Sequence, residues 1–360
     1  VPVSGSAYTY SYASMGEIIA WIVGWALILE YAIAASAVSV GWSNYFIGLV
    51  QSGLGLELPT FFTKGALAAV GGGINLPAVF IALAVTALLV VGTKESATFN
   101  AVLVVIKIVA LTAFIILAVP VMKMENFEPF TPLGFGGVSA AAASIFFAYV
   151  GFDAVSTAAE ETKNPQRNMP IGLIGSLVIC TIFYLLVAAG AIGAIGAQPV
   201  VDAAGQALAA GSKELQAQCA TLAFLALPSV VLMMLFGQTR IFFVMARDGL
   251  LPERLAKVHP KFKTPHVVTI ITGIFVTAAA AFFPVGQLAD ISNSGTLFAF
   301  MTVAIGVIIL RRTAPDRHRP FRTPMVWVVG PAAVAGCAYL FFNLSGYTEL
   351  MFLGWAAVGL

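Results

Sequence analysis

The chain has 360 residues, of which 60% are hydrophobic and only 9% are charged. Soluble globular domains carry about 25% charged residues, so this composition excludes a water-soluble protein, and the high hydrophobicity excludes intrinsic disorder. The net charge of +2 comes from scattered cations and argues against nucleic-acid binding. The composition instead indicates a helical protein that crosses a membrane several times.

In chain order, ten apolar runs predict membrane-spanning helices. They cover residues 16–43, 73–91, 99–119, 135–159, 171–193, 217–245, 267–283, 288–310, 325–342 and 347–360. The first residue is Val1, no signal-peptide pattern is present, and the last run would rise only about 21 Å against a hydrocarbon core of about 30 Å. We therefore expect an internal piece of a longer protein, with a clipped last helix.

Lysine and arginine are distributed unevenly over the connections between these runs. Alternate connections hold thirteen of them, whereas the opposite connections hold Lys64, Lys123 and Lys213. Because cytoplasmic loops are enriched in these residues, we expect the basic loops 246–266 and 311–324 to be cytoplasmic. Residues 1–15 then lie on the same side, so any preceding segment that starts in the cytoplasm contains an even number of helices.

Two ionisable residues lie near the middle of predicted spans. Glu30 is central in the run 16–43, and Lys107 is central in the run 99–119. A charge at the bilayer midplane costs about 2.5–3.5 kcal/mol on insertion scales, so such residues face a protein interior or a water-filled cavity and mark functional sites. Two alternatives remain open: a structural role in a fixed ion pair or backbone contact, and a pair between these two side chains.

The run 135–159 predicts either a broken helix or a continuous one. Around its middle, a stretch of small residues meets aromatic residues, then Gly151, then Asp153. Gly151 has high backbone freedom, and Asp153 has the side chain to cap a restarted half-helix. Transporters bind zwitterions and ions at such breaks, where backbone groups and helix dipoles are exposed. In the alternative, the helix is unbroken and the glycine makes a close helix contact.

Charged motifs lie at the cytoplasmic ends of two spans: residues 160–170 follow the run 135–159, and residues 237–240 and 246–252 close the run 217–245. Opposite charges this close together suit a gate of ion pairs, and solvated loop charges are an equal alternative.

No CxxC pair occurs among Cys180, Cys219 and Cys337, which argues against a disulfide framework and a structural zinc site.

Taken together, seven segments resemble the amino acid–polyamine–organocation (APC) superfamily, and within it the bacterial relatives of the cationic amino acid transporters. The segments are residues 1–10 (VPVSGSAYTY), 24–31 (GWALILEY), 149–153 (YVGFD), 160–165 (EETKNP), 237–240 (GQTR), 245–252 (MARDGLLP) and 319–324 (RPFRTP). They run in family order across nearly the whole chain, which makes the combination specific.

This resemblance implies an all-α polytopic membrane protein with an inverted five-helix-repeat fold, forming a single transporter domain over residues 1–360. In the family, the segment like residues 1–10 follows the second helix, so the first two of about twelve helices are expected to be absent. Residues 1–119 would be the remnant of the first repeat and residues 135–310 the second repeat. Residues 325–360 would be the last two helices, the final one truncated.

The resemblance also implies a substrate site built from two stretches. The stretch at the broken helix comprises Phe147, Ala148, Tyr149, Val150 and Gly151, and the stretch beside the substrate side chain comprises Leu232, Met233 and Met234. Family members that carry cationic amino acids have a small residue near the position of Met234. A methionine there implies small or medium neutral amino acids as substrates.

Three charged residues are implied to act in gating or proton coupling. Asp153 would belong to a gate or a proton relay. Lys107 lies where proton-coupled members carry a lysine in place of the sodium ion that other relatives bind between helices one, five and eight. Burial destabilises its charged form, and loss of its proton would couple protonation to alternating access. Glu30 is a second candidate for the moving proton, and the two can titrate as a coupled pair.

The leading hypothesis is therefore a secondary active transporter, a proton-coupled symporter of L-amino acids in the plasma membrane. The alternatives are an exchanger of amino acids or polyamines without proton coupling, and a channel, although no ring of charge or carbonyl filter is evident. An enzyme is not expected, because HExxH is absent and no GxSxG has a facing histidine. We expect no cofactor besides the proton, an amino acid and the lipid bilayer as partners, and leave a single-helix accessory subunit open.

Overall fold

The structure, a computed structural model, describes residues 5–68, 71–92, 96–131, 133–157, 162–196, 213–316 and 322–359. Every named element in these ranges is a helix, which confirms the all-helical prediction. The α-helices are α1 Ser6–Met15, α2 Glu17–Leu54, α3 Thr60–Thr63, α4 Leu76–Val91, α5 Ser96–Ala118, α6 Gly134–Ile145, α7 Ala154–Thr157, α8 Pro165–Ile195, α9 Lys213–Arg247, α10 His266–Phe282, α11 Val285–Thr313, α12 Val326–Phe341 and α13 Gly346–Gly359. Short 3-10 helices are η1 Val119–Val121, η2 Met124–Phe127, η3 Phe146–Tyr149 and η5 Glu253–Ala256.

Each predicted apolar run contains a helix, but not every helix is long enough to cross a membrane. Six described spans are long and apolar enough: Glu17–Leu54, Ala101–Val121, Gly134–Thr157, Pro165–Ala194, Phe224–Arg247 and Val285–Thr313. Helices α4 and α10 have 16 and 17 residues, and α12 and α13 meet at an angle of 110°, so this pair counts at most as a seventh span. The predicted number of ten crossings is therefore not confirmed.

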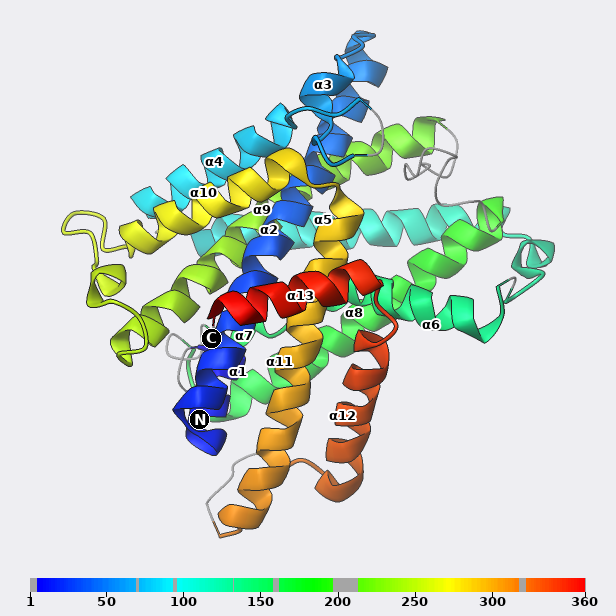
Figure 1. Cartoon of the computed structure of the whole chain (residues 1–360). Coiled ribbons are helices and arrows are strands. Elements are labelled where there is room, and N and C mark those ends of the chain that lie inside the picture. Colours follow the sequence, from blue (N-terminus) through cyan, green and yellow to red (C-terminus); the bar gives the residue numbers. More distant parts are fainter. Residues whose placement is uncertain are drawn as a thin grey trace.

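Helix α2 lies at the centre of the molecule, surrounded by α1, α4, α9, α10 and α11 (Figure 1). All residues from Ala26 to Ala37 are buried, and a helix that is buried on every side belongs to the core. Glycines on its neighbours allow close packing. A Cβ on Gly295 of α11 would lie 2.9 Å from the Ala26 carbonyl oxygen, and one on Gly237 of α9 would lie 2.6 Å from the Tyr31 ring.

The predicted end of this helix at residue 43 is wrong, because α2 continues to Leu54. No proline interrupts residues 44–54, so the helical hydrogen bonds continue although the sequence becomes more polar. The helix ends at Gly55, which adopts a left-handed conformation (φ 65°) and donates its N–H to the Gln51 carbonyl oxygen. Such a glycine is a common helix terminator.

Helix α1 was not predicted as a helix, since residues 6–15 carry small, polar and aromatic side chains without an apolar period. In the structure, Ser6, Ala7, Tyr8 and Ser11 are buried against neighbouring helices, mainly α2 and α11. A short helix gains most of its stability from tertiary packing, which local sequence does not reveal.

Helix α13 lies across α2 and α11 instead of extending along them (Figure 1). The rings of Trp25 and Trp355 stack with centroids 4.6 Å apart. The indole N–H of Trp25 donates to the Trp355 carbonyl oxygen (2.8 Å), and that of Trp355 donates to the Trp25 carbonyl oxygen (2.9 Å). This reciprocal pair holds α13 against α2. The sequence predicted α12 and α13 as two separate spans.

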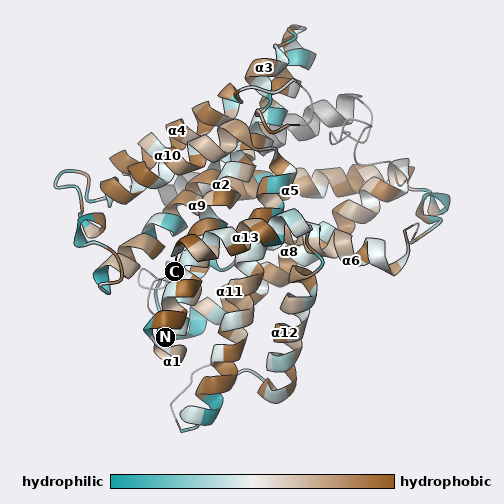
Figure 2. Ribbon diagram, viewed as in Figure 1, coloured by the Kyte–Doolittle hydropathy of each residue, from teal (hydrophilic) through white to brown (hydrophobic). Residues whose placement is uncertain are grey.

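Figure 2 shows apolar residues along the long helices and hydrophilic residues at the connections, including the basic loop between α9 and α10.

Several predictions fall outside the described residues. They concern positions in the ranges 1–4, 93–95, 158–161, 197–212 and 317–321, and thus Lys94, Glu160, Glu161, Arg317 and Arg319.

Candidate functional site

The helix break predicted within residues 135–159 is confirmed. Helix α6 ends at Ile145, η3 forms one tight turn, and Val150 is extended before α7 begins at Ala154. Gly151 has a φ of 104°, a conformation that is sterically unfavourable for residues with a side chain. The alternative of a continuous helix is therefore wrong, and the glycine is needed for the backbone path.

Gly151 lies against Met234 of α9. A Cβ added at Gly151 would collide with the Met234 methyl group, and Met234 is buried. The structure thus brings together two residues that the sequence predicted from separate motifs. Leu232 is half-buried in the core and Met233 is 37% exposed. Successive helix residues point about 100° apart, and Met234 is the one of the three that lies against Gly151.

The residues of η3 and the following Val150 face different neighbours. Phe147 packs against both large core clusters, and Val150 packs against the cluster that contains Met234. Tyr149 faces α8, where its hydroxyl lies 3.0 Å from the Thr181 hydroxyl. The Ala148 carbonyl oxygen accepts a hydrogen bond from the Tyr184 hydroxyl (2.6 Å), so this unwound backbone group is not free in the structure.

Asn293 of α11 contacts the end of α6. Its Nδ2 donates to the carbonyl oxygens of Ala143 (3.0 Å) and Ser144 (3.1 Å). Asn293 is fully buried, and its Oδ1 has no hydrogen-bond partner. The sequence analysis missed this residue. Its signal was the polar triplet Ser292, Asn293, Ser294 inside an apolar run.

Asp153 is buried just beyond the break and accepts two hydrogen bonds on one oxygen. The Ser6 hydroxyl of α1 donates to Asp153 Oδ2 (2.8 Å), and the Tyr31 hydroxyl of α2 donates to the same atom (2.7 Å). The other carboxylate oxygen has no partner. Neither Ser6 nor Tyr31 was predicted, although both lie in the motif segments 1–10 and 24–31.

Glu30 is fully buried, and neither of its carboxylate oxygens has a hydrogen-bond partner. The nearby Thr296 hydroxyl donates to the Ser292 carbonyl oxygen instead (3.1 Å). Asp153 is close enough for the two carboxylates to repel each other when both are charged. The alternative in which Glu30 pairs with Lys107 is wrong, because Glu30 has no donor.

Lys107 lies at the middle of α5 and points to α9. Its Nζ donates to the Ser229 hydroxyl oxygen (2.8 Å), and Ser229 in turn donates to the Ala226 carbonyl oxygen (2.7 Å). The side chain is half-buried, and its ammonium links two helices. This contact places a positive charge between α5 and α9.

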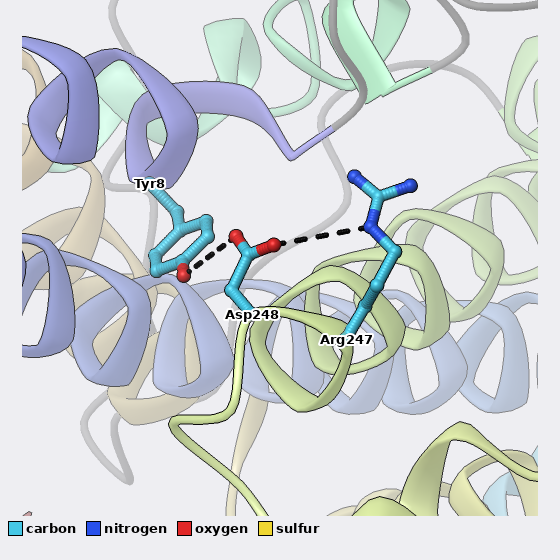
Figure 3. A network of polar contacts seen from close by, with 3 residues as sticks. All are labelled: Tyr8, Arg247 and Asp248. Atoms are coloured by element: carbon cyan, nitrogen blue, oxygen red, sulfur yellow. Dashed lines mark hydrogen bonds and ion pairs between the residues drawn. The ribbon is translucent and has the colours of Figure 1, made fainter.

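Helix α1 makes a second polar contact at the end of α9. Figure 3 shows the Tyr8 hydroxyl and the Arg247 guanidinium on opposite sides of the Asp248 carboxylate, with distances of 3.0 and 3.8 Å. Burial and the adjacent carboxylate raise the pKa of the Tyr8 phenol well above its ordinary value. Tyr8 therefore remains a donor at physiological pH, and α1 connects the break to the end of α9.

Comparison with known proteins agrees with this architecture. The model of the family described as "Amino acid permease" matches residues 1–356. The chain belongs to the amino acid permease family. The branched-chain amino acid permease BcaP of Bacillus subtilis is 46% identical over 372 residues, which cover all of this chain and 78% of that relative.

Two other relatives of this permease are named for different substrates. The methylthioribose transporter of Bacillus subtilis is 43% identical over 362 residues, covering all of this chain and 78% of that protein. The vacuolar cationic amino acid transporter 4 of Arabidopsis thaliana is 36% identical over 328 residues, covering 88% of this chain and 54% of the relative. The family and the apolar helices together make the chain a multi-pass membrane transporter of small molecules rather than an enzyme.

Proposed function

We propose that this permease is a proton-coupled symporter that moves neutral L-amino acids across the plasma membrane by alternating access. The observation that carries the proposal is the helix break at Gly151, next to two buried carboxyl groups, Asp153 and Glu30. A break exposes backbone groups and helix ends that bind a zwitterion, and the buried acids supply groups that exchange a proton.

Glu30 is the best candidate for the moving proton. An ionised carboxylate that is buried without donors is far more unfavourable than its protonated form. Asp153 differs, because it has two hydroxyl donors that stabilise its charge. Only one of two adjacent acids needs to be charged at a time, so the pair can bind and release one proton during the cycle. Lys107 is the second titratable group of this scheme: its ammonium stands in the place of a bound sodium ion between α5 and α9, and loss of its proton would release that contact.

Neutral side chains of medium size fit the surroundings of the break. Met234, Phe147 and Val150 are apolar, and Met234 fills the space beside Gly151. The relative named as a branched-chain amino acid permease supports the same substrate class. The relative named as a methylthioribose transporter makes that sugar a second compound to be included in competition assays.

The proposal includes the topology that the charges predict. The basic loops 246–266 and 311–324 would face the cytoplasm, since thirteen lysines and arginines lie in alternate connections. Residues 135–310 would form one inverted repeat and residues 1–119 part of the other. No cofactor other than the proton is required by this scheme, and an accessory subunit remains an open expectation.

Flux in proteoliposomes that contain the full-length protein tests this function, and all uptake measurements below use variants of that protein. With an inside-alkaline pH gradient of about one unit and no sodium, we expect leucine to accumulate up to about tenfold, since one unit corresponds to a tenfold ratio at equilibrium for one proton. A protonophore should abolish the accumulation. Uptake that requires a preloaded amino acid and ignores the pH gradient would establish the alternative, an exchanger. Absence of flux for every amino acid would reject the proposal.

Substitution of Met234 tests the substrate assignment. Met234→Ser removes the side chain that lies against Gly151, so we expect arginine to compete for uptake at least about tenfold better than in the parent, a change of about 1.4 kcal/mol in binding. Competition by unlabelled arginine against labelled leucine measures this. Met233→Ser is the matched control, because Met233 is the exposed neighbour. Equal arginine competition in the parent and in Met234→Ser would contradict the assignment.

A further inference from the structure

We propose that Asn293 is a positioning residue for transport: it anchors the end of α6 to α11 and holds the helix break in its substrate-binding geometry. This inference rests on the proposed function. It concerns a residue of α11, which the sequence assigned no role.

The donors of Asn293 match a specific need of α6. The last carbonyl groups of a helix have no intrahelical partner, and water is scarce within a membrane-spanning region. An asparagine amide carries two N–H donors, and Nδ2 of Asn293 reaches two of these carbonyl oxygens, those of Ala143 and Ser144. One side chain therefore satisfies two backbone groups at the point where the helix stops.

Helix α11 is itself fixed at this level. All residues from Ile291 to Leu297 are buried, so neighbours surround the helix. The Ser292 hydroxyl donates to the Glu30 carbonyl oxygen of α2 (3.2 Å), and Gly295 lies close to the Ala26 backbone. Adjacent residues Ser292 and Asn293 thus connect α11 to the central helix and to the broken helix.

The two sides of the break are held by different chemistry. On the α6 side the anchor is a neutral amide, which does not change charge with pH. On the α7 side the anchor is the Asp153 carboxylate, which accepts from Ser6 and Tyr31. The titratable groups that face Asp153 are Glu30 and Tyr31 of α2 and Tyr10 of α1. Protonation of Asp153 therefore weakens only the anchor on the α7 side. The segment between α6 and α7 then moves about the end of α6 that Asn293 holds.

The test uses two replacements of nearly the same size. Asn293→Leu removes both donors together with the unpartnered Oδ1, and Asn293→Asp keeps the shape but replaces the donors by acceptors. We expect the maximal rate of leucine uptake in proteoliposomes to fall about a hundredfold in both, on the scale of small misplacements in functional sites. Because Leu removes the unpartnered Oδ1 but leaves the carbonyl oxygens of Ala143 and Ser144 without this donor, we expect uptake to fall far more than the melting temperature.

Asn126→Leu is the matched control, since Asn126 also donates its Nδ2 to a helix carbonyl, that of Gly193 (2.7 Å), in a contact between η2 and α8. We expect parental uptake from it. If Asn293 only filled space in the core, Asn293→Leu would be tolerated and Asn293→Asp alone would be harmful. Parental uptake by Asn293→Leu would therefore overturn the inference.

A second measurement covers variants that lose uptake for other reasons. With Cys180, Cys219 and Cys337 replaced by serine, spin labels at Ile145→Cys and Ile305→Cys report the distance between the end of α6 and α11, since both side chains are exposed. We expect a distance distribution about twice as wide in Asn293→Leu, because unsatisfied helix ends fray. An unchanged width would overturn the anchor. If the parent transports no amino acid, the proposed function fails, whereas the distance measurement still decides the anchor.

Discussion

Lys107→Ala is expected to abolish pH-driven accumulation while the permease remains folded and able to bind substrate. The ammonium of Lys107 donates to Ser229 (2.8 Å) and places a positive charge between α5 and α9. Without this charge, gain or loss of a proton at residue 107 no longer changes the interaction between α5 and α9. Under a pH gradient of about one unit, the accumulation ratio should drop from as much as about ten to about one, since a tenfold ratio corresponds to about 1.4 kcal/mol.

The measurement is labelled leucine uptake in proteoliposomes at steady state, with binding followed separately by thermal stabilisation. Lys123→Ala is the control, because Lys123 is an exposed loop lysine. Ser229→Ala removes the acceptor alone and should lower the accumulation less than Lys107→Ala, since the charge remains. Unchanged proton-driven accumulation in Lys107→Ala, or sodium-dependent uptake by the parent, would falsify the coupling role.

Gly151→Leu is expected to abolish leucine uptake, by at least about a hundredfold, without unfolding the permease. The residue has a φ of 104°, and any side chain there meets Met234. Backbone strain of this kind costs about 1–3 kcal/mol, which is less than the typical stability of about 5–15 kcal/mol. Initial uptake rates and melting temperatures measured together separate loss of function from loss of folding.

Gly55→Leu provides the matched control for the backbone strain. Gly55 also has a positive φ, but its surroundings are open and it lies at the end of α2. The collision has its own test in the pair Gly151→Ala and Gly151→Ala with Met234→Ser. If the collision contributes, the double variant should recover part of the uptake that Gly151→Ala loses. Normal uptake by Gly151→Leu would show that the break is not part of the substrate site.

Several features could be predicted because they depend on local properties of the sequence. Apolar run length located a helix in each predicted range, since a helix that faces lipid or core needs continuous apolar residues. The sequence around Gly151 predicted the break as one of two alternatives, since only glycine readily adopts a φ of 104°. Glu30 and Asp153 were selected because charges are rare in such runs, and both are buried in the structure.

Other features required the tertiary structure, because their partners are distant in sequence. Ser6 and Asp153 are 147 residues apart, and Asn293 and Ala143 are 150 residues apart. Nothing in either segment alone specifies that the two will meet. The same holds for α1, whose ten residues have no apolar period and are helical through packing.

By itself, the sequence determined that this protein is a helical membrane protein, that one apolar run contains a glycine and an acid suited to a break, and that a lysine lies at the centre of another. These follow from hydropathy and backbone conformation, which act within a few residues. Only the tertiary structure decided which side chains satisfy the buried polar groups. It assigned Ser6 and Tyr31 to Asp153, Ser229 to Lys107, and left Glu30 without a donor. Hydrogen-bond satisfaction inside a membrane protein depends on helix packing, since no water replaces a missing partner.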